Sequence, residues 1–149
     1  MAAVAEQVTR TRVAFERVER LERIADALAA RHDPSAAELR DVVDDLVDDV
    51  EPVRVAAAAE VLKVSKMTIT SWLRRGIFKR AAAEANVVVL DPHRLHAVLH
   101  ILEELRRAGI KPGNFAEQLW HRLEDGELAE SDFFLRGLED YRAGRVQKA

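Results

Sequence analysis

The sequence predicts a mainly helical protein with one small β element. Residues of high helix propensity such as Ala, Leu, Glu and Arg are abundant in the 149-residue chain, which has only 6 Gly and 4 Pro. Apolar residues recur at intervals of three and four over most of the sequence, as on one face of an α-helix. With 48% hydrophobic residues, the chain has enough apolar content for a folded core.

Residues 1–51 are expected to form a helical hairpin. The first helix ends before Pro34, because the residue that precedes a proline avoids helical angles. Ser35 then caps a second helix, with Glu38 at the capping-box spacing, and Pro52 ends it. The two apolar stripes must be covered by the next domain or by a second subunit. They are Phe15, Val18, Leu21, Ile24, Ala25 and Leu28, then Leu39, Val42, Val43, Leu46, Val47 and Val50.

Residues 52–108 are expected to form the central domain. Two short helices come first, and two short apolar or β-branched runs at 77–80 and 87–90 then suggest a β-hairpin. A longer helix begins at Asp91-Pro92, with proline in its first turn, and continues to about Arg107. Its buried stripe is Leu95, Val98, Leu99, Leu102 and Leu105.

Residues 109–149 are expected to form a helical C-terminal section. One helix starts at Pro112 and runs to about Leu123, and a last helical segment runs from Phe133 to about Tyr141.

Charge is distributed unevenly, although the formal net charge is only −3. Residues 41–51 hold six acids and no base. Between Arg54 and Arg80, seven basic residues face a single acid, Glu60, so this basic window has a net charge of +6. A basic segment in an acidic protein indicates a surface that binds phosphates. A solvated helix face is the alternative interpretation.

The basic window has the pattern of two short helices joined by a tight turn. The first helix needs small residues where the second crosses it, and Ala58 and Ala59 supply them. Ser65 is suited to cap the second helix. The side chains that we expect to be buried around the turn are Leu62, Val64, Ile69, Trp72 and Leu73.

This stretch, about 40 of the 149 residues, resembles the helix-turn-helix of bacterial transcription regulators, and most closely the winged MerR and phage-excisionase group. The matching features are the small residues 57–59, the turn Leu62-Lys63-Val64-Ser65, the pair Thr68-Ile69 with Trp72, and Gly76-Ile77. The turn has Lys63 where glycine is usual in the group. The resemblance implies a winged helix-turn-helix, flanked here by helical hairpins, that binds double-stranded DNA.

A recognition helix reads base edges from its N-terminal half. The helical period turns the polar face of the second helix outward, and its candidate base contacts are Ser65, Lys66, Met67, Thr70 and Ser71. Arg74 and Arg75 lie nearer its end and are candidate phosphate contacts.

The hairpin at 77–90 corresponds to the wing of the resembled group, which lies against the DNA backbone. Lys79 and Arg80 would sit on it. The tip, residues 81–86, lacks the glycines and basic residues usual there, so we do not expect it to insert deeply into the minor groove.

The C-terminal tail holds three of the eight aromatic residues of the chain, all within nine positions. Residues 138–146 resemble the tail of many bacterial antitoxins, with the pattern Leu-Glu-Asp, any residue, Arg-Ala-Gly-Arg. This resemblance implies a clamp for a protein toxin, and the candidate partner-binding residues are Phe133, Phe134, Leu138, Tyr141, Arg142 and Arg145. The alternative is a last helix that closes the core.

Three histidines, His93, His96 and His100, repeat at helical spacing, and Glu103 continues the line. Imidazoles one turn apart can chelate a metal, but histidines that face solvent or pack against another segment are the simpler interpretation. The chain has no Cys, no glycine loop for phosphate and no recognisable Ser-His-Asp spacing. We therefore assign no catalytic residue, metal or cofactor, and expect no enzyme.

From these features we expect a sequence-specific DNA-binding repressor that forms a homodimer, and in its most specific form the antitoxin of a toxin–antitoxin pair. The alternatives are a stand-alone MerR- or excisionase-like factor, and a protein-interaction adaptor that uses the fold as a scaffold. No stretch approaches the ~18 apolar residues of a membrane span. No signal peptide is visible, so we expect a cytoplasmic protein without membrane contact.

Overall fold

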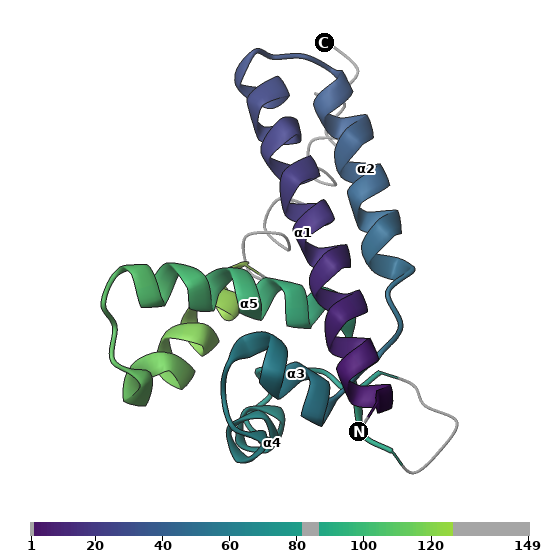
Figure 1. Cartoon of the computed structure of the whole chain (residues 1–149). Helices are drawn as coiled ribbons and strands as arrows, with labels where there is room; N and C mark the ends of the chain where they lie inside the picture. Colours follow the sequence, from purple (N-terminus) through teal and green to yellow (C-terminus); the bar gives the residue numbers. More distant parts are fainter. Residues whose placement is uncertain (1, 82–86, 127–149) are drawn as a thin grey trace, which may run out of the picture.

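The computed structural model describes residues 2–81 and 87–126 (Figure 1). Helices dominate it, and two short strands pair in one antiparallel sheet, so the expected fold class is confirmed. Figure 1 shows a helical hairpin, α1 and α2, that stands on a base formed by the other helices. In chain order the elements are α1 (Ala2–Ala30), α2 (Ser35–Asp48), β1 (Val53–Arg54), α3 (Val55–Leu62), α4 (Lys66–Arg74), β2 (Val89–Leu90), α5 (Pro92–Arg107), the 3-10 turn η1 (Pro112–Asn114) and a helix over residues 115–126.

The start of α2 differs from the expectation. Pro34 is the N-cap residue and has helical angles, φ −64° and ψ −19°, and no side chain of that residue caps the helix. The carboxylate of Asp33 instead accepts the backbone N–H of Ser35 at 2.9 Å. The prediction that Ser35 is the cap is wrong. The fixed φ of Pro34 is already helical, so Ser35 becomes the first residue of α2 and not the residue before it.

The main core lies in the base and includes the first half of α1. Val8 and Phe15 of α1 belong to the same buried cluster as Trp72 of α4 and Leu95 of α5. A second, smaller cluster joins α1 to α2 higher in the hairpin, with Val18, Val43 and Val47 at its centre and Leu21 beside them. The hairpin is therefore rooted in the base by α1.

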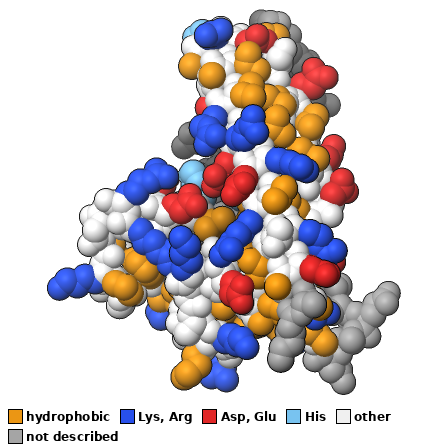
Figure 2. All heavy atoms as spheres, in the orientation of Figure 1, with side chains coloured by type: hydrophobic (Ala, Val, Ile, Leu, Met, Phe, Trp, Pro, Cys, Tyr) orange, Lys and Arg blue, Asp and Glu red, His pale blue; other side chains and the backbone are white. Residues whose placement is uncertain are grey.

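Part of the apolar surface of the hairpin stays exposed in a single chain. Val13 and Ile24 of α1 are 39% and 51% exposed, and Val42 and Leu46 of α2 are 46% and 40% exposed. Ile24, Val42 and Leu46 belong to the predicted stripes but lie beside the line along which α1 and α2 pack. Figure 2 shows hydrophobic side chains along the visible face of the hairpin.

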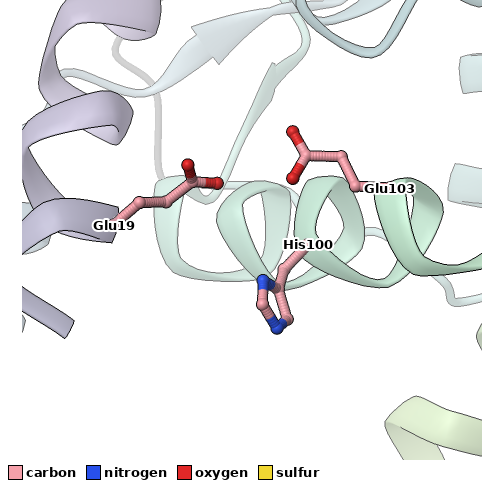
Figure 3. A group of neighbouring side chains, drawn as sticks. All are labelled: Glu19, His100 and Glu103. Atoms are coloured by element: carbon pink, nitrogen blue, oxygen red, sulfur yellow. The ribbon is translucent and has the colours of Figure 1, made fainter. Parts of the chain in front are cut away.

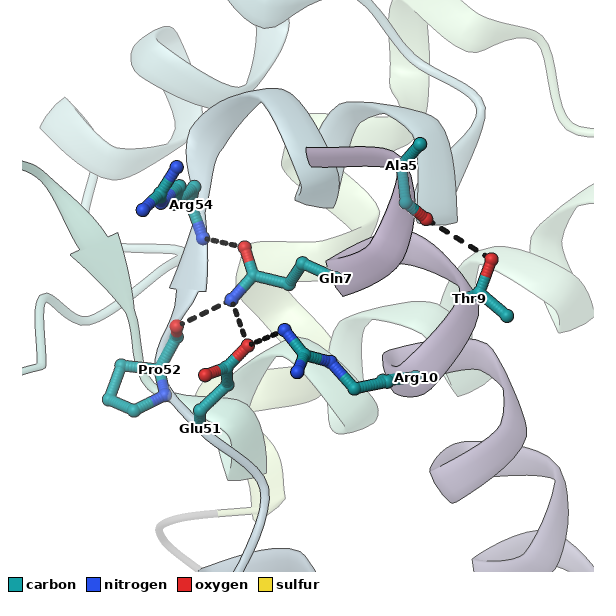
Figure 4. Close-up of polar contacts among 7 residues, drawn as sticks. All are labelled: Ala5, Gln7, Thr9, Arg10, Glu51, Pro52 and Arg54. Carbon is teal, nitrogen blue, oxygen red and sulfur yellow. Dashed lines mark hydrogen bonds and ion pairs between the residues drawn. The ribbon is translucent and has the colours of Figure 1, made fainter. Parts of the chain in front are cut away.

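The amide of Gln7 joins α1 to β1 (Figure 4). Its Nε2 donates to the carbonyl oxygen of Pro52 at 3.0 Å and to Glu51 Oε1 at 3.1 Å, and its Oε1 accepts the backbone N–H of Arg54 at 3.1 Å. Arg10 pairs with the same Glu51 oxygen at 2.9 Å. Gln7 is buried, and its amide thereby pairs with two backbone groups, the carbonyl of Pro52 just before β1 and the N–H of Arg54 within it.

The sheet is smaller than a full wing. β1 pairs antiparallel with β2, with Val53 opposite Leu90 and Arg54 opposite Val89. Arg80 forms an isolated antiparallel bridge with Leu90. The expected pairing of residues 77–80 with 87–90 is thus present in short form. Of its tip, residues 81–86, only Ala81 is among the described residues. The β1 strand was not expected, since two residues are too few for a recognisable alternation.

The hairpin rests on the histidine face of α5. The buried ring of His96 lies 5.0 Å from the ring of Phe15, and its Nδ1 is 3.8 Å from Glu22 Oε1. His93 Nε2 lies 2.5 Å from Asp48 Oδ1 of α2. Burial, with smaller contributions from His100 and His93, lowers the pKa of His96 to about 4, so this ring is neutral at pH 7. The interpretation in which the histidines pack against another segment is confirmed for His93 and His96.

Candidate nucleic-acid interface

The turn between α3 and α4 depends on a left-handed residue. Lys63 has φ 59° and ψ 46°, and the next N–H, that of Val64, donates to the carbonyl oxygen of Ala59 at 3.0 Å. A side chain in this conformation costs roughly 1–2 kcal/mol relative to the usual helical angles. Lys63 therefore adopts the conformation that makes glycine usual at such a helix end.

Arg106 of α5 holds this turn in place. Its Nη2 donates to the carbonyl oxygen of Leu62 at 2.7 Å and contacts that of Lys63 at 3.4 Å, and its guanidinium lies 5.8 Å from the centre of the Phe115 ring. The last carbonyls of a helix lack partners within the helix, so a cation here satisfies them and complements the negative helix end. Arg106 thereby connects the turn to the supporting helices.

The start of α4 is capped as expected. Ser65 Oγ accepts the backbone N–H of Thr68 at 3.1 Å and lies 2.9 Å from Thr68 Oγ1. The hydroxyl of this candidate base contact is thus engaged at the helix end. Thr70, another candidate, is partly buried, and its Oγ1 donates to the carbonyl oxygen of Lys66 at 3.0 Å.

The two faces of α4 are those that the helical period predicts. Ile69 and Trp72 are buried among the small residues of α3 and the wing residues Ile77 and Phe78. The outer face is exposed, and at its N-terminal half Met67 has 83% of its surface accessible. The exposed candidates on α4 and just beyond it are Ser65, Lys66, Met67, Ser71, Arg74 and Arg75.

The positive charge of this region lies at the surface of the protein. All seven basic residues of the basic window are exposed, Lys79 and Arg80 of the wing included. Within residues 2–81 and 87–126, no carboxylate pairs with Lys66, Arg74, Arg75 or Arg80. Exposed cations that are not neutralised within the protein attract the phosphates of nucleic acid.

A cavity of about 680 Å³ lies beside α4, next to the exposed basic face. It lies between the turn and the segment that follows α5, with Val64, Trp72 and Phe115 among its apolar lining. Basic residues that sequence reasoning did not assign to the interface also line it: Lys63, Arg106 and Lys111. No local signal marks Arg106 or Lys111, because they come from segments distant in sequence from α4.

Comparisons with protein-family models, curated proteins and solved structures gave no match to this chain. Among the described residues, no helix combines the length and apolar character that crossing a membrane requires.

The candidate partner-binding residues of the tail lie outside the described residues. They are Phe133, Phe134, Leu138, Tyr141, Arg142 and Arg145.

Trp72→Ala should lower the free energy of unfolding by about 3–5 kcal/mol, because it leaves a cavity where the indole packs near Phe78, 6.1 Å between ring centres. Met67→Ala on the opposite face of α4 should change it by less than about 0.5 kcal/mol. Urea unfolding followed by circular dichroism measures both. A Trp72→Ala protein as stable as the wild type would show that the faces of α4 are assigned the wrong way round.

Proposed function

We propose that this protein is a sequence-specific DNA-binding regulator that inserts α4 into the major groove. The observation that carries the proposal is the exposed basic face at α4, where Lys66, Arg74 and Arg75 have no described carboxylate partner. The capped N-terminus and the buried inner face of the same helix support it, because a recognition helix must be anchored on one side and exposed on the other.

Each exposed residue has a role that follows from its place on α4. Lys66 in the first turn donates to guanine, and the Met67 side chain contacts a thymine methyl group. Arg74 and Arg75, at the end of the helix, bind phosphates and set the register. The wing residues Lys79 and Arg80 contact the backbone beside the groove.

Dimerisation through the hairpin is part of this proposal. Val42 and Leu46 lie one helical turn apart on α2, and Val13 and Ile24 lie close to three turns apart on α1, so each pair shares one face of its helix. A second copy is the occupant that suits such faces in a DNA-binding repressor. Two linked recognition helices read half-sites about one helical turn of DNA apart.

The most specific form of the proposal is an antitoxin that represses its own operon and neutralises a protein toxin through its tail. The support is the sequence of the tail alone, which has five aromatic or leucine side chains and three arginines within residues 133–145. Side chains of these types, the aromatic rings and arginines above all, anchor many protein interfaces. A stand-alone regulator uses the same DNA-binding face without a toxin.

The Arg74→Ala/Arg75→Ala variant should bind all DNA duplexes more weakly, because it removes two phosphate contacts. The slope of log K against log salt concentration should fall by about 0.9 for each lost contact. Fluorescence anisotropy of a labelled duplex from upstream of the gene, at several salt concentrations, measures both quantities. Arg17→Ala/Arg20→Ala is the matched control, since it removes two exposed arginines from α1. Unchanged binding by the Arg74/Arg75 variant, or equal losses in both variants, would contradict the proposal.

Val42→Glu/Leu46→Glu should convert the dimer into a monomer, because it places two carboxylates in the proposed contact between hairpins. Sedimentation velocity at micromolar concentration measures the state. Met67→Glu/Val87→Glu is the control, because it adds the same charge at two exposed apolar positions outside the hairpin, and it should remain dimeric. A wild-type protein that sediments as a monomer would refute dimerisation.

Truncation after residue 130 should leave a folded, DNA-binding protein that no longer binds the product of the adjacent gene. Both buried clusters lie within the retained residues, which is why the remainder should fold. Pull-down with the neighbouring gene product and circular dichroism measure the two properties. Phe134→Ala/Tyr141→Ala in the full chain tests the same clamp without removing backbone. If truncation unfolds the protein, the tail is part of the core, and the antitoxin proposal loses its support.

A further inference from the structure

Three potential metal ligands meet where α1 packs against α5 (Figure 3). Glu19 of α1 and His100 and Glu103 of α5 each offer one ligand atom, and these atoms all lie within 4.8 Å of one another. Figure 3 shows the carboxylates of Glu19 and Glu103 approaching each other from the two helices. Both glutamates are partly buried, whereas His100 is exposed. The fold thus brings together ligands that are far apart in sequence.

The far side of the His100 ring is already held by a carboxylate. Its Nε2 lies 3.2 Å from Glu104 Oε1, and the other oxygen of Glu104 accepts a hydrogen bond from Arg122 at 2.6 Å. Nδ1 is therefore the ring nitrogen left for a ligand. Histidines that bind metals in proteins usually give their second ring nitrogen to a carboxylate or carbonyl in this way, which orients the ring.

The electrostatics of this crossing favour a bound cation. Burial raises the pKa of Glu19, and the nearby Glu103 raises it further, although His100 and Arg23 act in the opposite direction. Burial likewise raises the pKa of Glu22, one turn along α1. The neighbouring His96 adds no charge, because its ring is buried and neutral, and its Nε2 has no hydrogen-bond partner among the described residues. Two partly buried carboxylates are thus brought together here, and Glu103 opposes the ionisation of Glu19.

We propose that Glu19, His100 and Glu103 bind a divalent transition-metal ion of the zinc type. One imidazole and two carboxylates suit Zn²⁺ or Co²⁺, with water completing the coordination, whereas Mg²⁺ and Ca²⁺ prefer sites built from oxygen alone. The ion ties α1 to α5. α1 is part of the hairpin, and α5 contributes Arg106, which holds the turn before α4. The ion therefore couples the hairpin to the position of α4. An effect of the metal ion on DNA binding rests on the proposed function, whereas metal binding itself does not.

Titration of Zn²⁺ into the metal-free full-length protein should show one saturable site per chain by calorimetry. It should also raise the melting temperature, because the ion binds the folded protein alone. Glu103→Gln, Glu19→Gln and His100→Ala should each weaken Zn²⁺ binding at least ~10-fold, since each removes a direct ligand. Mg²⁺ at the same concentration should not compete. The glutamine variants keep the size of the side chain and remove a repulsive charge, so they are expected to fold.

The matched control is His121→Ala. His121 and Glu117 form a similar pair one turn apart on the helix over residues 115–126, with 3.8 Å between Nε2 and Oε1, and no third ligand joins them among the described residues. This variant should bind Zn²⁺ like the wild type. The absence of saturable Zn²⁺ binding, an unaltered affinity in Glu103→Gln, or an equal loss in His121→Ala would overturn the site.

The coupling is tested by DNA binding with and without Zn²⁺. The wild type should change its DNA affinity when Zn²⁺ is added, and Glu103→Gln should not. Unchanged affinity in the wild type overturns the coupling and leaves the metal site, which calorimetry establishes separately. A wild-type protein that fails to bind DNA even without metal refutes the proposed function instead, so the two failures are distinguishable.

Discussion

The left-handed turn at Lys63 is the constraint on which the base of the molecule depends. It ends α3 and allows α4 to start three residues later, so that α4 crosses the alanines of α3 and buries Ile69 and Trp72. The cost of a lysine in this conformation, roughly 1–2 kcal/mol, is similar in size to one hydrogen bond from a charged group, about 1.5–3 kcal/mol. The contact from Arg106 to the carbonyl of Leu62 is of that kind. The face that α4 exposes thus depends on a residue of a distant helix.

The hairpin is not a separable appendage of this base. Phe15 and Val8 contribute to the main core, and Gln7 satisfies backbone groups of β1 from within α1. Removal of the hairpin would therefore expose the main core to water and remove the hydrogen bonds that Gln7 makes. For that reason the role of the hairpin in self-association is better tested by substitutions on its exposed face than by deletion.

Local sequence patterns predicted the structural features that are set by residues within one or two helical turns of each other, such as helix caps and buried faces. The cap at Ser65, the buried face of Ile69 and Trp72 and the exposure of Lys66 and Arg74 follow from helical spacing alone. The pattern failed at Ser35, where the fixed angle of Pro34 outweighed a favourable capping box. Local patterns could not reveal the hydrogen bonds of Gln7 or those of Arg106 to the turn, because the partners lie 43 to 47 residues away in sequence. The same holds for the metal ligands, because Glu19 by itself looks like any polar residue on a helix.

The charge at the contact between α1 and α5 depends on pH in two opposing ways. The pKa of His96 falls from 6.5 to about 4 on folding, so its contribution to stability is lost as the pH drops through that interval. The pKa values of Glu19 and Glu22 are raised, so these groups favour the fold when protonated and oppose it once the pH rises above their shifted values. At neutral pH the His96 ring is therefore uncharged, whereas burial makes ionisation of Glu19 and Glu22 less favourable than in the unfolded chain. A divalent cation held by Glu19, His100 and Glu103 would offset the repulsion between the two ligand carboxylates, so the charge at this crossing and its geometry suit the same ligand.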